Sequence, residues 1–251
     1  MRPKKSLGQN FLKSEPALKK MIEVGEVSGE DVILEIGPGK GALTKHLLAC
    51  GCKLIAIEKD EELFNFLKEK FKKEIKEKKM ILINKDILQF KIKNYELQNY
   101  KIIANIPYNI TGSILKKFLT ETTQPEKMVL LVQKEVSERI VARDKKESIL
   151  SISVKAYGDP KVIMKVPARY FSPAPKVDSA IIAINNISRK IFEKNNINEE
   201  KFWEIVKKGF AHKRKKLSSN LKGLVPADSP VIGGKRAEDL SLLDWISISK
   251  T

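Results

Sequence analysis

The stretch DVILEIGPGKGALTKHLLAC, residues 31–50, decides the fold. DVILEI is typical of a buried strand, and GALTKHLLAC has the pattern of a helix. The glycines between them let the backbone turn sharply and approach a ligand closely at the point where the helix starts. A strand, a glycine loop and a helix in this order are typical of a cofactor-binding loop, although a purely structural turn is the alternative.

The alternation of strand-like and helix-like stretches continues through the first two-thirds of the chain, where apolar runs alternate with amphipathic stretches. The pattern predicts a mostly parallel sheet wrapped by helices, followed from about residue 187 by a Lys-rich segment that is helical in pattern. We therefore expect an α/β domain over residues 1–186 and a small helical domain over residues 187–251. The expected strands are residues 52–58, 80–84, 100–104, 128–133, 161–171 and 179–185, and the expected helices are 60–79, 111–120, 134–142 and 148–156.

The composition favours a polyanionic partner. The chain has 251 residues, with 48 Lys and Arg against 31 Asp and Glu, a net charge of +17. Nucleic acid or an anionic surface suits that charge, although a solvated Lys-rich surface would have the same composition. No apolar run is long enough for a membrane helix and no signal peptide is recognisable, so we expect a cytoplasmic protein without a membrane partner.

Cysteine and histidine are too few for most metal or nucleophilic sites. Cys50 and Cys52 are the only cysteines, and the only two histidines, His46 and His212, lie far apart in the sequence. We expect a reduced cysteine pair, no metal site and no histidine-based catalysis.

The glycine loop has an acidic partner at the end of the next strand. Glu58 lies where a carboxylate can accept hydrogen bonds from the ribose hydroxyls of an adenosine-containing cofactor. Gly37, Gly39 and Ala42 also fit the dinucleotide fingerprint, so a nicotinamide cofactor stays open at this point. Glu35 and Gly41 extend the loop to E-x-G-x-G-x-G, which resembles motif I of S-adenosylmethionine-dependent methyltransferases. Asp86, after the third strand, suits that family as well.

The stretch NIPYNI, residues 105–110, follows the expected strand at 100–104 and has the chemistry of a pocket for an exocyclic amine. The Asn105 side-chain carbonyl can accept an N–H, and Pro107 fixes the direction of the neighbouring backbone carbonyls. Tyr108 offers a flat face on which a base can stack. A tight turn with a core tyrosine is the alternative.

Asn-Ile-Pro-Tyr resembles motif IV of the amino-methyltransferases, in the form found in ribosomal RNA adenine N6-dimethyltransferases. Four further blocks resemble that family in the expected order, so that the resemblance covers nearly the whole chain: KKSLGQNFL (4–12), VQKEVSERIVA (132–142), FSPAPKVDSA (171–180) and AHKRKKLSSNL (211–221). The resemblance implies a Rossmann-like class I methyltransferase domain with a mostly parallel seven-stranded sheet, and a small C-terminal helical domain.

The resemblance also implies roles for individual residues. S-adenosylmethionine would be bound by Asn10, Leu12, Gly37, Gly39, Glu58, Asp86 and Asn105. Asn105 and the Pro107 carbonyl would hold the target N6 amine, and Tyr108 and Phe171 would sandwich a flipped adenine. We assign rRNA phosphates to the six cations Lys207, Lys208, Lys213, Arg214, Lys215 and Lys216, although a solvated helix face is an alternative.

Two substrates compete within the family. KsgA-type enzymes dimethylate two adjacent adenines in the 3′-terminal hairpin of small-subunit rRNA, and Erm-type enzymes modify one adenine of large-subunit rRNA. KKSLGQNFL and the HKRKKLSSNL block resemble the KsgA type, whereas Lys40-Gly41 and DILQF (86–90) have Erm character. We expect the KsgA type, acting as a monomer on a pre-small ribosomal subunit. A non-catalytic assembly factor is the alternative from another class.

Overall fold

The computed structural model describes residues 3–4, 7–95, 97–225 and 231–250. The chain forms two compact units, one of Met1–Ser137 with Lys161–Ile187 and one of Glu138–Pro160 with Ser188–Thr251. Residues 138–160 thus group with the C-terminal helices, whereas the sequence pattern placed them in the α/β domain. Aromatic contacts account for this grouping, because the ring of Tyr157 lies 5.6 Å from that of Phe192 and 6.1 Å from that of Trp203.

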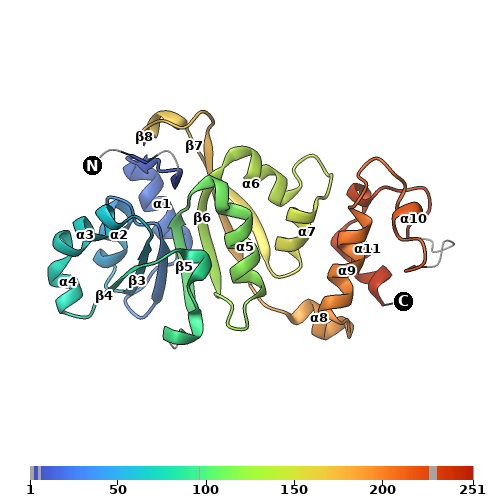
Figure 1. Ribbon diagram of the computed structural model, residues 1–251, viewed down its shortest axis with the longest axis horizontal. Helices are drawn as coiled ribbons and strands as arrows, with labels where there is room; N and C mark the ends of the chain where they lie inside the picture. Colours follow the sequence, from blue (N-terminus) through green and yellow to red (C-terminus); the bar gives the residue numbers. More distant parts are fainter. Residues whose placement is uncertain (1–2, 5–6, 96, 226–230, 251) are drawn as a thin grey trace. The chain divides into compact units, whose positions relative to one another are not determined.

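The first unit is built on a seven-stranded sheet with the strand order β4-β3-β2-β5-β6-β9-β7 (Figure 1). Parallel pairs join β2 to β3 and β5, β3 to β4, and β5 to β6, whereas β9 runs antiparallel to β6. The predicted α/β class with a mostly parallel seven-stranded sheet is therefore confirmed. The strands are β2 (Val32–Ile36), β3 (Lys53–Glu58), β4 (Met80–Asn84), β5 (Tyr100–Asn105), β6 (Lys127–Gln133), β7 (Asp159–Val166) and β9 (Ser179–Asn185).

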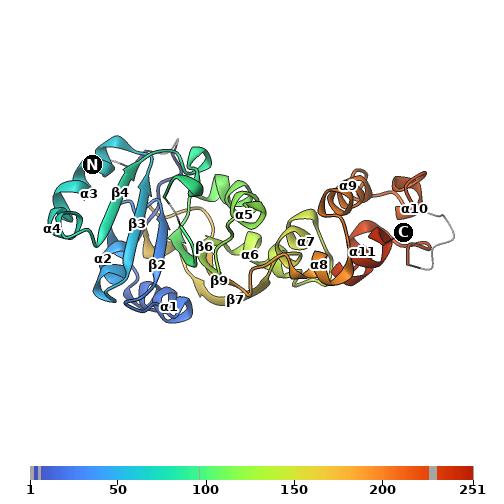
Figure 2. The same ribbon diagram turned by 90° about the horizontal axis from the view of Figure 1, so that it is seen from below.

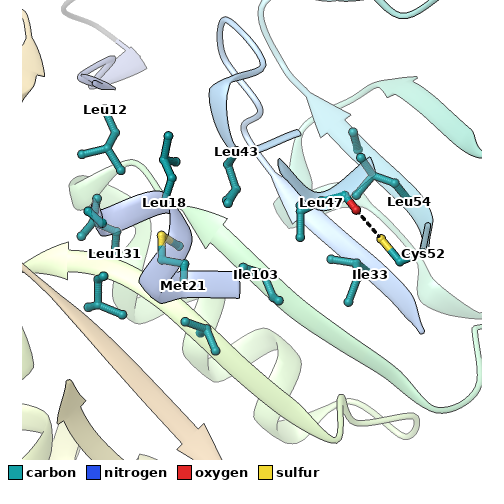
Figure 3. Close-up of a cluster of buried hydrophobic side chains, with 14 of the residues drawn as sticks. Leu12, Leu18, Met21, Ile33, Leu43, Leu47, Cys52, Leu54, Ile103 and Leu131 are labelled. Atoms are coloured by element: carbon teal, nitrogen blue, oxygen red, sulfur yellow. Dashed lines mark hydrogen bonds between the residues drawn. The ribbon is translucent and has the colours of Figure 1, made fainter. Parts of the chain in front are cut away.

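Helices cover the sheet of this unit, with α1 and α5 on opposite sides of it in Figure 2. Figure 3 shows how Leu18 and Met21 of α1 and Leu47 of α2 meet strand residues such as Ile33 in one buried cluster. The thiol of Cys52 lies in this cluster and donates a hydrogen bond to the Leu47 carbonyl at 3.3 Å. The helices are α1 (Glu15–Gly25), α2 (Ala42–Ala49), α3 (Glu61–Lys70), α4 (Lys72–Lys76) and α5 (Thr111–Thr120).

Two expected elements are divided in the structure. The helix expected over residues 60–79 is interrupted at Phe71, whose φ of −110° and ψ of 28° separate α3 from α4 while its ring stays buried. The strand expected over residues 161–171 becomes β7 and the short β8 (Phe171–Ser172). β8 pairs antiparallel with β1 (Phe11–Leu12), a two-stranded ribbon that the sequence analysis did not predict.

The second unit is helical. Its core includes Phe202 and Trp245, which are fully buried, and the ring of Phe210 stacks on that of Trp245 at 5.5 Å. It contains the second half of α6 (Lys134–Val141), together with α7 (Ile149–Lys155), α8 (Lys190–Asn195), α9 (Glu199–Gly209), α10 (Leu217–Asn220) and α11 (Leu242–Ser249). None of the described helices is long and apolar enough to cross a membrane.

Candidate active site

A cavity of about 490 Å³ lies where β2, β3, β4 and β5 end. Ligands of open α/β sheets bind at this edge, beyond the carboxyl ends of the strands. The structure brings nine of the predicted site residues into its wall: Asn10, Leu12, Gly37, Gly39, Glu58, Asp86, Asn105, Pro107 and Tyr108.

The glycine loop reaches its shape through left-handed backbone conformations. The φ angles of Gly39 and Gly41 are +60° and +75°, a region that side chains rarely allow. Gly41 is also the N-cap of α2, and a Cβ on it would lie 2.6 Å from the ring of Phe71. A residue larger than glycine at position 41 would therefore be both strained and overpacked.

Glu58 ties the loop to the end of β3. Its carboxylate accepts hydrogen bonds from the backbone N–H of Gly39 at 3.1 Å and of Asp60 at 2.9 Å. Burial raises the pKa of Glu58, and these two N–H groups counteract part of that shift. A carboxylate offers about four lone-pair sites, so Glu58 can hold the loop and still accept hydroxyl hydrogen bonds from a ligand.

Glu35 stands behind the loop and is only 1% exposed. Burial raises its pKa to about 8, although the Thr44 hydroxyl donates a hydrogen bond to it at 2.7 Å. The nearby Glu58 contributes to this rise, and a pKa of about 8 favours the protonated form of Glu35 at neutral pH.

Asp86 lines the cavity just after the end of β4. One carboxylate oxygen forms an ion pair with Lys59 at 2.8 Å, and the other accepts the backbone N–H of Leu88 at 2.9 Å. The hydrogen bond from Lys59 lowers the pKa of Asp86 more than burial raises it. Asp86 therefore presents a fixed negative group next to Ile87 and Leu88, which also line the cavity.

Asn105 ends β5 with its amide held in a defined orientation. Its Nδ2 donates a hydrogen bond to the backbone carbonyl of Asn10 at 3.1 Å, which leaves Oδ1 as the acceptor available to a ligand. Tyr108 is held by a hydrogen bond of 2.6 Å between its hydroxyl and the hydroxyl of Ser179 at the start of β9. Burial raises the pKa of Tyr108, and the hydrogen bond to Ser179 opposes that shift.

The N-terminal segment is fastened to the wall by Asp60, which the sequence analysis did not single out. Asp60 caps α3 by accepting the backbone N–H of Glu62 at 3.0 Å. It also accepts hydrogen bonds from Lys4 Nζ at 2.9 Å and Gln9 Nε2 at 2.8 Å. These contacts hold the segment that contributes Asn10 and Leu12 to the cavity.

Phe171 is the one predicted pocket residue that does not line the cavity. It pairs with Leu12 in the β1–β8 ribbon and is 4% exposed, within the buried core. Side chains of an extended chain alternate between faces, so burying Phe171 turns its neighbour Ser172 into the cavity wall. The adenine sandwich between Tyr108 and Phe171 stays a prediction, and Phe171 does not line the cavity in this structure.

Comparison with known proteins agrees with this geometry. The sequence model of the family "Ribosomal RNA adenine dimethylase" matches residues 1–250. The ribosomal RNA small subunit methyltransferase A of Dehalococcoides mccartyi is 37% identical over 257 residues, covering 98% of this chain and 87% of that protein. This chain belongs to the ribosomal RNA adenine dimethylase family.

Solved structures show the same fold. A dimethyladenosine transferase from Plasmodium falciparum has a TM-score of 0.78 at 25% identity, with 95% of each chain covered. The 23S rRNA methyltransferase ErmE has a TM-score of 0.77 at 22% identity, covering 96% of this chain and all of that one. The resemblance noted from the Asn105–Tyr108 stretch and the glycine loop is thereby confirmed at the level of family and Rossmann-like methyltransferase fold.

The six cations predicted to contact RNA lie in the second unit. All are exposed: Lys207, Lys208, Lys213, Arg214, Lys215 and Lys216. Lys207 and Lys208 occupy the last turn of α9, where positive charge also complements the helix dipole. The other four follow α9 in an irregular turn before α10, a position with no such structural benefit.

Two residues that shape the site had no sequence signal of their own. Asp60 resembled any helix cap, and Ser179 any polar residue at the start of a strand. The only hints were that Gln9, which hydrogen-bonds Asp60, belongs to KKSLGQNFL and that Ser179 belongs to FSPAPKVDSA. Their roles depend on partners far away in the sequence, which only the folded chain supplies.

Proposed function

We propose that this protein transfers methyl groups from S-adenosylmethionine to the N6 amines of two adjacent adenines in the 3′-terminal hairpin of small-subunit rRNA. One observation carries the proposal: a single cavity combines an oriented Asn105 amide and the Pro107–Tyr108 turn with the two carboxylates Glu58 and Asp86. The small subunit is favoured because relatives of 35–37% identity over 98% of this chain carry the name ribosomal RNA small subunit methyltransferase A.

The cavity residues fit S-adenosylmethionine. Glu58 would accept the ribose hydroxyls, Asp86 the adenine amine, and Ile87 and Leu88 would lie beside the adenine ring. Gly37 and Gly39 permit close approach of the loop backbone, and Asn10, Leu12 and Asn105 would surround the methionine end. The cofactor, when bound, supplies an electrophilic methyl group on its sulfonium.

The remaining residues hold the target amine. An adenine N6 lone pair is delocalised into the ring and is a poor nucleophile. Acceptance of its two N–H bonds by Asn105 Oδ1 and the Pro107 carbonyl favours a more pyramidal nitrogen, whose lone pair can point at the methyl group. Tyr108 would stack on the base. Much of the acceleration then comes from placement, with effective molarities on the order of 10⁵–10⁸ M for well-oriented pairs.

No dedicated base is needed in this scheme. The alkylated ammonium product is acidic and loses its proton readily. The target base must leave its stack to enter the cavity. A second methyl group on the same nitrogen requires that the monomethylated base re-enter after the cofactor has been exchanged.

The domain over residues 187–251 would supply the RNA contact. Its exposed cluster, Lys207 to Lys216, suits the phosphates of rRNA within a pre-small ribosomal subunit, where phosphate contacts position the enzyme without specifying sequence. We propose a cytoplasmic monomer. An Erm-type role on large-subunit rRNA is the alternative substrate, and a purely structural assembly factor is the alternative class.

The decisive experiment incubates the protein with labelled S-adenosylmethionine and with undermethylated small and large subunits side by side. Nucleoside mass spectrometry then counts N6,N6-dimethyladenosine in each rRNA. We expect two per small-subunit RNA. Product in the large-subunit RNA alone would transfer the assignment to the Erm type, and absence of product from both would leave a binding protein.

A further inference from the structure

The turn that leads into β8 carries an exposed tyrosine whose backbone is next to residues of the cavity wall. Tyr170 is 39% exposed, at the end of a short 3₁₀ helix, Ala168–Tyr170. Its carbonyl accepts the backbone N–H of Lys13 at 2.8 Å, and both Lys13 and Ser172 line the cavity. The Tyr170 backbone is therefore one hydrogen bond away from Lys13 and two residues before Ser172, both of which line the cavity.

The backbone that leads to Tyr170 is hydrogen-bonded to Asp178, the residue before the one that holds Tyr108. Asp178 accepts the backbone N–H of Ala168 at 3.0 Å and forms an ion pair with Lys165 at 2.8 Å. The next residue, Ser179, hydrogen-bonds the Tyr108 hydroxyl. The 3₁₀ turn that ends at Tyr170 and the Tyr108 hydroxyl are thus hydrogen-bonded to adjacent residues, and ordering both segments before binding reduces the entropy cost of a ligand that contacts both.

The surroundings of Tyr170 are positively charged. The guanidinium of Arg169 lies 5.3 Å from the centroid of the Tyr170 ring. Arg169, Lys13 and Lys176 are all exposed, and Val177 in the same loop is 48% exposed. An aromatic face with cations around it is the combination by which proteins bind unpaired nucleotides, with stacking for the base and charge for the phosphate.

We propose that Tyr170 is the stacking site for the unpaired nucleobase directly next to the target adenine. This inference rests on the proposed function, in which the target base is extruded into the cavity and its neighbour on the strand remains at the mouth. Phe171 is 4% exposed, whereas Tyr170 is 39% exposed and its backbone adjoins the cavity-lining residues Lys13 and Ser172. Of the two adjacent adenines, the second would stack on Tyr170 and stay beside the cavity until it enters the cavity to be methylated.

The test compares Tyr170→Ala and Tyr170→Phe with wild-type protein on undermethylated small subunits. Stacking energies predict that Tyr170→Ala raises KM for the subunit roughly 5- to 150-fold. We expect kcat and the KM for S-adenosylmethionine to stay near wild-type values, and Tyr170→Phe to restore subunit affinity because it keeps the ring. The slope of affinity against salt should not change, since no phosphate contact is removed.

Phe66→Ala is the matched control. Phe66 is 38% exposed and has Lys70 Nζ 5.6 Å from its ring centroid, but it does not line the cavity. Wild-type methylation with equal KM values for Tyr170→Ala and Phe66→Ala would overturn the inference and leave the proposed function intact. Equal impairment of Tyr170→Ala and Tyr170→Phe would also overturn it. Absence of methylation by the wild-type protein would instead refute the proposed function.

Discussion

Burial decides the protonation state of Glu35, the carboxyl group behind the glycine loop. Its pKa rises from 4.5 to about 8 because the group is desolvated and lies near Glu58. The folded protein therefore holds a proton that the unfolded chain releases above pH 4.5. Since the folded state binds more protons in this window, the stabilising effect is complete below pH 4.5 and is lost as the pH rises through about 8.

Glu35→Gln removes this titration while keeping the size of the side chain and an acceptor for Thr44. We expect the free energy of unfolding of the variant to increase relative to wild type between pH 4.5 and pH 8, by up to a few kcal/mol. Urea unfolding at pH 5, 6.5 and 8 measures the difference. Parallel pH profiles for the two proteins would show that Glu35 ionises normally in the fold.

Asn105 is the residue on which the chemistry depends most directly. Asn105→Ala removes the acceptor for the target amine, and we expect the single-turnover methylation rate to fall at least on the order of 100-fold, since misplacement of the reacting atoms has a cost of this size. RNA affinity should stay close to wild type. Asn109→Ala, in the same cavity wall, controls for general damage. Loss of RNA binding by Asn105→Ala would instead make Asn105 a structural residue.

At the scale of elements, Asp60 joins two segments that the sequence does not connect. It caps α3 and also receives Lys4 and Gln9, so that helix and N-terminal segment share one carboxylate. Asp60→Ala loses both functions, whereas Asp60→Ser keeps a capping oxygen but is too short to hold Lys4 and Gln9. Comparison of these two variants therefore separates the effect of capping α3 from the effect of holding the N-terminal segment.

We expect both variants to raise the KM for S-adenosylmethionine, because Asn10 and Leu12 are no longer held in the wall. Only Asp60→Ala should also lose stability, by about 0.5–2 kcal/mol, the usual effect of removing an N-cap. Isothermal titration with the cofactor and thermal unfolding measure the two effects. Wild-type cofactor affinity in Asp60→Ser would show that the N-terminal segment stays in place without Asp60.

Helices and strands were predictable from the sequence wherever the local pattern of apolar residues and the tertiary structure favour the same element. The apolar runs at 80–84 and 179–185 became β4 and β9 with the expected bounds, because the composition of a buried strand is distinctive. Phe71 kept its buried position, yet the backbone turned there, which spacing alone cannot reveal. The β1–β8 ribbon depends on pairing between two-residue strands from opposite ends of the unit, so neither it nor the burial of Phe171 had a local signal.

At the scale of the whole molecule, charge was predictable in sign and in place along the chain, because composition and sequence already record it. The irregular turn between α9 and α10 places Lys213, Arg214, Lys215 and Lys216 in solvent. Neither a helix dipole nor burial in the core explains four adjacent cations there, so their repulsion is a cost that a bound polyanion would offset. An RNA interface at this turn predicts that their effect depends on salt.

Replacement of all four by Gln should weaken RNA binding and reduce the slope of log affinity against log salt by roughly 0.7–0.9 for each phosphate that is no longer neutralised. A matched variant with Gln at four exposed lysines of α3 and α4, Lys68, Lys70, Lys72 and Lys73, removes the same charge elsewhere. Binding titrations between about 50 and 200 mM salt separate the two. If both variants reduce the slope equally, net charge rather than this turn draws the protein to RNA, and an unchanged slope would remove the turn from the interface altogether.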